Sequence, residues 1–134
     1  MGAWGTGTFE NDDACDFAAE VAENSNLALI ERALNRVIDA GTDYLEAPVA
    51  AEGLAAADIV ARLAGRPGEQ TPYTETIDKW VAKMKIAPSP ALLEKAKQAV
   101  ARTNSEASEL LELWADSGEL KPWQDSVNQL LSRL

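Results

Sequence analysis

Apolar residues recur at the spacing of an α-helix along almost the whole chain, and no segment alternates as a strand would. Proline and glycine separate the helical segments, and the clearest loop is GRPGEQTP at 65–72. This pattern predicts an all-α fold, a single-domain bundle of about six helices over 1–134, with an ordered Gly/Trp-rich N-terminal arm at 1–10. The predicted helices cover 11–23, 26–40, 48–64, 75–85, 90–117 and 122–134.

Several of these helices carry recognisable start signals. Asn11 is placed to cap the first helix, and Asp12 and Asp13 follow in the first turn, where the helix dipole favours negative charge. Ser89 precedes Pro90 in the same way, as a cap followed by a proline at the first helical position. These signals fix the expected starts more firmly than hydrophobic periodicity alone.

The segment 90–117 is open to a second interpretation. Its apolar residues keep one phase from Leu92 to Trp114, which favours a single long helix that ends at Gly118. However, the residues from Thr103 to Glu106 have the pattern of a capping box, which would begin a new helix there. We expect one long helix that is bent at this point.

The chain is strongly acidic, with 22 acidic against 12 basic residues and a formal charge of −10. Residues 1–70 hold 13 of the acidic and only 4 of the basic residues. Such a field repels nucleic acid and favours cationic partners, metal ions or plain solubility. Within this half, Asp58 and Arg62 are four residues apart on a polar sector and are expected to form an ordinary surface pair. No apolar run is long enough to cross a membrane, and the N-terminus lacks the features of a secretory signal, so we expect no membrane partner.

The absent residue types exclude several kinds of chemistry. The chain has no histidine and one cysteine, Cys15, which rules out Ser-His-Asp and Cys-His catalysis, histidine-bound zinc or haem, and a thiolate metal cage. Gly2, Gly5 and Gly7 do not form a phosphate loop, because no strand precedes them and no lysine follows. We therefore expect no catalytic, cofactor-binding or metal-binding residues, no cofactor, and a location in the reducing cytoplasm.

Carboxylates nevertheless gather on the outer face of the first predicted helix, at Asp12, Asp16, Glu20 and Glu23. Oxygen ligands at helical spacing could hold magnesium or calcium, but such sites draw ligands from more than one element. We interpret this face first as solvated charge and next as a surface for a basic partner. Glu52 is different, because it falls in the middle of the apolar stripe of the helix at 48–64 and needs a partner, expected from backbone or tryptophan N–H groups.

The aromatic residues are expected to be structural. Trp80, Trp114 and Trp123 lie on apolar helical stripes and are predicted to belong to the core, although a cluster of them could also line a ligand pocket. Glycines permit tight turns in the arm, so Trp4 and Phe9 are predicted to insert into the bundle. Burial of Trp4 predicts that Trp4→Ala costs roughly 3–5 kcal/mol.

The opening MGAWGTGTFENDDACDF resembles the start of a bacterial family known as domain of unknown function 4259. The shared pattern is a Gly-Ala-Trp-Gly start, then a phenylalanine and Asn-Asp before a short helix. The resemblance extends to 55–61, to 108–114 and to Trp123, so it spans most of the chain. It implies an intact natural domain that is complete at its N-terminus. It implies no activity, because the family name records none.

These observations favour a non-enzymatic acidic bacterial protein that binds another macromolecule, such as a basic protein, in an immunity-like or regulatory role. The first alternative is a carboxylate-based, metal-dependent enzyme, in which Glu52 and aspartates of the first helix would converge within about 5 Å. The second alternative is a small-molecule sensor with a pocket lined by tryptophans. The candidate site residues are Asp12, Asp13, Asp16, Glu20 and Glu52, with Trp4, Phe9 and Asn11 as structural anchors.

Overall fold

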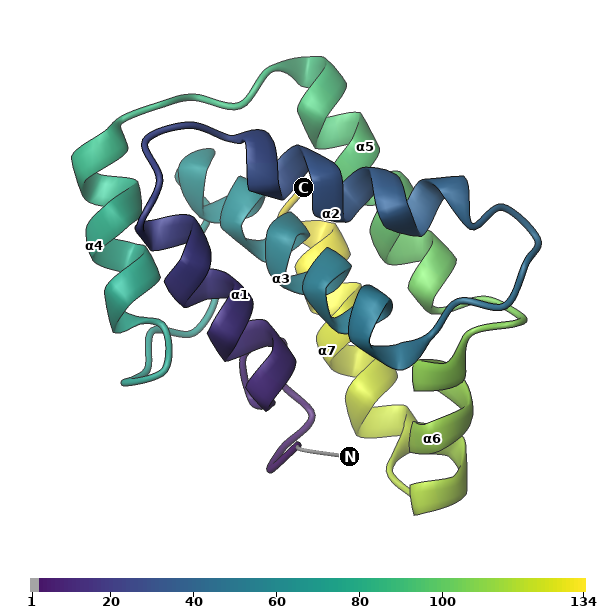
Figure 1. The fold of residues 1–134 in the computed structure, drawn as a ribbon. Helices are drawn as coiled ribbons and strands as arrows, with labels where there is room; N and C mark the ends of the chain where they lie inside the picture. The colour runs from purple at the N-terminus through teal and green to yellow at the C-terminus, as the bar shows by residue number, and fades with distance from the viewer. Residues whose placement is uncertain (1–2) are drawn as a thin grey trace.

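A computed structural model describes residues 3–134, and the all-α prediction is confirmed within that range. Figure 1 shows the helices gathered into one bundle, with α3 at its centre. The described residues form α1 (Asp12–Ala22), α2 (Ala28–Asp39), α3 (Ala47–Leu63), α4 (Glu75–Met84), α5 (Pro90–Thr103), α6 (Glu109–Ser117) and α7 (Leu120–Ser132).

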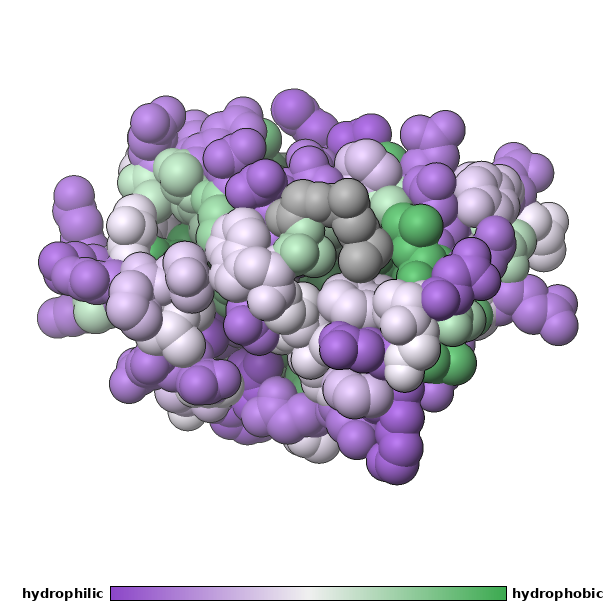
Figure 2. Space-filling view, turned by 90° about the horizontal axis from the view of Figure 1, so that it is seen from below, coloured by the Kyte–Doolittle hydropathy of each residue, from purple (hydrophilic) through white to green (hydrophobic). Residues whose placement is uncertain are grey.

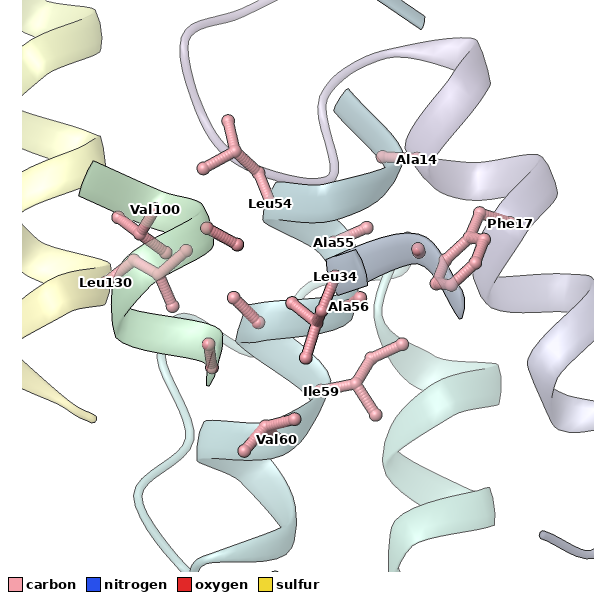
Figure 3. Close-up of a cluster of buried hydrophobic side chains, with 14 of the residues drawn as sticks. Ala14, Phe17, Leu34, Leu54, Ala55, Ala56, Ile59, Val60, Val100 and Leu130 are labelled. Carbon is pink, nitrogen blue, oxygen red and sulfur yellow. The ribbon is translucent and has the colours of Figure 1, made fainter. Parts of the chain in front are cut away.

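The central helix α3 is buried because its side chains are small and apolar nearly all round. It contacts every other helix of the bundle, α1, α2, α4, α5, α6 and α7. Figure 3 shows Phe17 of α1 on one side of α3, and Val100 of α5 and Leu130 of α7 on the other. Alanine side chains keep α3 narrow, which lets helices approach it from several directions.

Gly53 marks a close approach between α2 and α3. A Cβ atom at this position would lie 2.4 Å from Cγ2 of Val37, which is fully buried on α2. Glycine lowers the intrinsic stability of a helix interior by about 1 kcal/mol relative to alanine. Here that cost is offset by the close packing of α3 against Val37.

The prediction of one long helix over 90–117 is wrong, because the chain breaks into α5 and α6. The break also lies later than the predicted capping box, since Ser108 rather than Thr103 caps the new helix. Its cause is a contact distant in sequence: Leu45 N donates to Ala107 O at 2.8 Å, and Glu109 N donates to Leu45 O at 2.9 Å. The apolar residues keep the same helical spacing on both sides of the break because α5 and α6 both pack on α3.

The remaining predicted helices agree with the structure to within two residues at each end. The largest differences include α7, which begins at Leu120, so that Pro122 lies inside the first turn. Proline is tolerated there because the first N–H groups of a helix have no partner within it. No helix in the described part of the chain is long and apolar enough to span a membrane.

The N-terminal arm is ordered as predicted over its described part, residues 3–10. It closes on itself through Trp4 N, which donates to Glu10 O at 3.0 Å. The predicted cap is confirmed, because Asn11 Oδ1 accepts from Ala14 N at 2.8 Å. Phe9 is buried in the core, as predicted. The predicted arm also included Met1 and Gly2, which lie outside the described residues.

Candidate functional site

Trp4 is the clearest departure from the sequence-based prediction. Instead of being largely buried, it is 46% exposed and packs on Tyr73, which is 51% exposed and lies in the connection between α3 and α4. The two ring centroids are 5.2 Å apart, with the planes inclined at 48°. Phe9 takes the inward position of the arm, whereas Trp4 lies where the arm closes on itself and meets this connection. The arm therefore presents an aromatic pair to solvent, and a cost of 3–5 kcal/mol for Trp4→Ala no longer follows.

Tyr73 also lines a cleft of about 380 Å³, which we call the arm cleft. Its walls come from the arm, from α3, from the connection between α3 and α4, and from α7. The arm lies at the lower end of the molecule in Figure 1, and Figure 2 views the molecule from that side. Weakly polar residues, drawn white, gather near the centre of this face beside hydrophobic ones, drawn green, and hydrophilic residues, drawn purple, lie mainly around the margin.

The floor of the arm cleft is a network of buried charges. Asp58 of α3 binds two arginines, with Oδ1 2.7 Å from Arg62 Nε and Oδ2 2.7 Å from Arg133 Nη2. Arg62 also reaches Asp78 Oδ1 at 2.6 Å and the Glu69 carbonyl oxygen at 2.9 Å. Only 4% of the Asp58 side chain and 2% of the Arg62 side chain are exposed. A buried charge network of this kind needs nearly complete pairing, and here the two arginines have acceptors at every side-chain nitrogen.

The network corrects the prediction that Asp58 and Arg62 form an ordinary surface pair. Their helical spacing gave the correct partner, but the polar sector of α3 is covered by other elements. Arg133 follows α7, which packs on α3, and binds Asp58 from 75 residues away in the sequence. Phe9 of the arm covers Arg62, whose Cζ is 5.5 Å from the centroid of the ring.

The glycines of the arm make room for a carboxylate. Glu10 Oε1 accepts from Gly7 N at 2.9 Å, which turns the side chain back into the loop of the arm. A Cβ atom at Gly7 would lie 2.5 Å from Oε1, and one at Gly5 would lie 2.4 Å from Oε2. Within residues 3–134 the Glu10 carboxylate has no ion-pair partner.

The carboxylates predicted on the outer face of α1 are all exposed. No ion pair within residues 3–134 involves any of them. This acidic face continues directly from the arm, because α1 begins two residues after Glu10. It consists of Asp12, Asp13, Asp16, Glu20 and Glu23.

Glu52 of α3 is only partly buried, with 33% of its side chain exposed. Its partner is Arg36 of α2, with Nη1 3.4 Å from Oε2, and not the expected backbone or tryptophan N–H group. Burial raises the pKa of Glu52; Arg36 opposes this, and Asp13 and Glu20 add to it. The described residues contain no group of three or more Asp, Glu, Cys or His side chains placed to hold a metal ion.

Trp80, Trp114 and Trp123 are buried, which confirms their predicted place in the core. Trp80 Nε1 donates to the Asn24 carbonyl oxygen at 2.7 Å, between α4 and the end of α1. Trp114 and Trp123 border a separate cavity of about 40 Å³. Sites for small molecules usually measure about 300–1,000 Å³, so this cavity gives no support to a tryptophan-lined sensor pocket.

Several residues of the site were not singled out from the sequence, among them Glu10 and Glu69. Tyr73, Asp78 and Arg133 come from a loop, a short helix and the end of the last helix, and none of them belongs to a local motif. Arg133 is 75 residues from its partner Asp58, so no helical spacing could have linked the two.

The fold and the arm cleft define an all-α acidic domain that presents carboxylates and an aromatic pair at one end. The family model described as Domain of unknown function (DUF4259) matches residues 2–126, and the chain belongs to this family. Arg133 lies outside the matched range. No curated protein and no solved structure matches the chain.

Proposed function

We propose that this protein is a non-enzymatic binding protein that recognises a basic partner protein through the arm and the acidic face of α1. The observation that carries the proposal is the position of the exposed Trp4–Tyr73 pair, next to carboxylates that have no ion-pair partner within residues 3–134. Aromatic residues are enriched in protein interfaces, and complementary charge speeds and orients association.

The distribution of the arginines supports the same proposal. Arg62 and Arg133 are bound to Asp58 inside the arm cleft. Arg102 donates to the carbonyl oxygens of Gly41, Asp43 and Ala107. These guanidinium groups are therefore not available to neutralise the acidic face of α1. With a formal charge of −10, the chain favours a basic protein over nucleic acid.

An immunity-like or regulatory role in the cytoplasm is the class of function that fits a small acidic domain of this kind. No carboxylate cluster supports metal-dependent catalysis among the described residues. The proposal accordingly assigns the acidic residues to recognition rather than to chemistry.

The test is affinity capture from native lysate at low and at physiological salt, with the captured proteins identified by mass spectrometry. The test variant combines Asp16→Asn, Glu20→Gln and Glu23→Gln on the acidic face of α1. The control variant removes the same charge elsewhere, through Glu31→Gln, Asp39→Asn and Glu94→Gln, which are all exposed on α2 and α5.

We expect a basic protein that the native chain and the control capture, and that the test variant and added salt release. Capture of no protein would contradict the proposal, and so would equal capture by both variants. Circular dichroism of each variant establishes that the helices are intact.

A further inference from the structure

We infer that the arm cleft binds one arginine side chain of a partner protein, with the guanidinium group held between the Glu10 carboxylate and the ring of Tyr73, on which Trp4 packs from outside the cleft lining. This inference deepens the proposed function and rests on it, because it names the group that the basic partner inserts. The argument has three steps: the charge of the cleft, its aromatic rim, and the fixed position of the carboxylate.

The cleft is built for a cation rather than for an anion. The basic residues that line it, Arg62 and Arg133, already have an acceptor at each of their side-chain nitrogens. An anionic ligand would have to displace one of these acceptors from an arginine. Three carboxylates line the same cleft against these two arginines, and two of the three, Glu10 and Glu69, have no ion-pair partner within residues 3–134.

The aromatic rim selects a flat cation. Tyr73 lines the cleft and is about half exposed, and the half-exposed Trp4 packs on it with ring centroids 5.2 Å apart. A guanidinium group stacks on an aromatic face and donates N–H groups to a carboxylate in the same plane, whereas a lysine ammonium offers only a point charge. The same geometry already occurs inside the protein, where Arg62 lies over Phe9 and binds Asp58.

Glu10 is held in place before any ligand arrives. Its Oε1 accepts from Gly7 N at 2.9 Å, and the carboxylate lies against Gly5 and Gly7, where a Cβ atom would displace it. A carboxylate fixed by the backbone loses little conformational freedom when a ligand binds. The arm therefore supplies a preorganised acceptor for the guanidinium group.

The test is a titration of the intact chain with a capped Gly-Arg-Gly peptide, followed by ¹⁵N–¹H NMR. We expect saturable shifts of the Gly7 amide and the Trp4 indole, with a Kd of about 1 mM, as befits a single small contact group. The same peptide with citrulline, which is uncharged, should bind at least about tenfold more weakly, because it loses the charge-assisted hydrogen bond. The lysine peptide should bind more weakly than the arginine peptide.

Two variants locate the site. Glu10→Gln keeps an oxygen for Gly7 N but removes the charge, and should weaken the arginine peptide at least about tenfold. Trp4→Ala should also weaken it, whereas the control Glu94→Gln on α5 should leave the Kd unchanged. Unaltered spectra outside the arm show that each variant is folded.

Several results would overturn the inference. These are an arginine peptide that causes no shifts, a citrulline or lysine peptide that binds as tightly, an unchanged Kd in Glu10→Gln, and saturable shifts of the same residues with inorganic phosphate. If the arginine peptide does not bind but partner capture still depends on the acidic face of α1, only the inference about the arm cleft is refuted. Peptide binding without any captured partner would refute only the proposed function.

Discussion

Replacing Asp58 by asparagine removes the charge that two arginines share in the floor of the arm cleft. Asp58 and Arg62 are almost fully buried, and Arg133 is 12% exposed. Removing one partner of a buried ion pair costs about 3–5 kcal/mol, because the remaining charge loses both water and its counterion. Asparagine keeps one oxygen that can accept from Arg62 Nε, so we expect the lower end of this range, about 3 kcal/mol.

The assay is urea unfolding followed by circular dichroism of the helices. With a urea m-value of about 1.5–2 kcal/mol per molar, a loss of about 3 kcal/mol lowers the midpoint by roughly 1.5–2 M. The matched control is Asp125→Asn, which breaks the exposed pair with Lys121 at 3.1 Å and should cost at most about 0.5 kcal/mol. An Asp58→Asn midpoint that falls no further than this control would refute the argument.

A second variant keeps the test informative if Asp58→Asn does not fold. Arg133→Met leaves Asp58 paired with Arg62, so we expect a smaller loss of about 1–2 kcal/mol. In the double variant the guanidinium of Arg133, which Asp58→Asn alone leaves unpaired, is gone. The double variant should therefore lose less unfolding free energy than the sum of the two single losses. Additive losses would show that Asp58 and Arg133 do not act on each other.

Three further predictions follow from the same structure. Phe9→Ala should lower the free energy of unfolding by about 3–5 kcal/mol and the half-exposed Trp4→Ala by only about 1 kcal/mol, so equal losses in urea unfolding would contradict their placement. Burial raises the pKa of Glu52 in the folded protein. Ionised Glu52 therefore lowers the free energy of unfolding at a pH above this folded-state pKa, and the loss disappears at a pH below the unfolded-state pKa. Glu52→Gln should therefore raise the urea midpoint of unfolding near pH 7 but not at about pH 3. An equal rise at both pH values would show that ionisation of Glu52 is not the cause. Burial and nearby carboxylates raise the pKa of the Cys15 thiol, so Asp16→Asn should speed its alkylation by iodoacetamide near pH 8, and an unchanged rate would contradict this.

The helices were predictable from sequence because their signals are local. Asn11 and Ser89 cap their helices as their positions indicate. Asn11 Oδ1 accepts from Ala14 N at 2.8 Å, and Ser89 Oγ accepts from Leu92 N at 3.1 Å. The break between α5 and α6 was placed wrongly because it depends on Leu45, which lies about sixty residues earlier in the chain. Local periodicity carries no information about such a contact.

The candidate site shows the same division between local and distant causes. Spacing of four residues correctly paired Asp58 with Arg62, but their burial depends on elements from both ends of the chain. For the same reason, sequence alone could not decide which aromatic residue of the arm turns inward. Phe9 does so, and its ring packs in the hydrophobic core with Arg62 Cζ 5.5 Å from its centroid.

This arrangement links the stability of the fold to the shape of the arm cleft. The ring of Phe9 rests on Arg62, Arg62 is fixed by Asp58, and Asp58 is bound in turn by Arg133 after α7. Glu10 follows Phe9 directly in the chain, so its position depends on how Phe9 is seated. The charges buried on α3 therefore fix the surface that carries the exposed aromatic pair. A loss of this network should disorder the arm before it unfolds the bundle, because α3 retains its apolar contacts with the other helices.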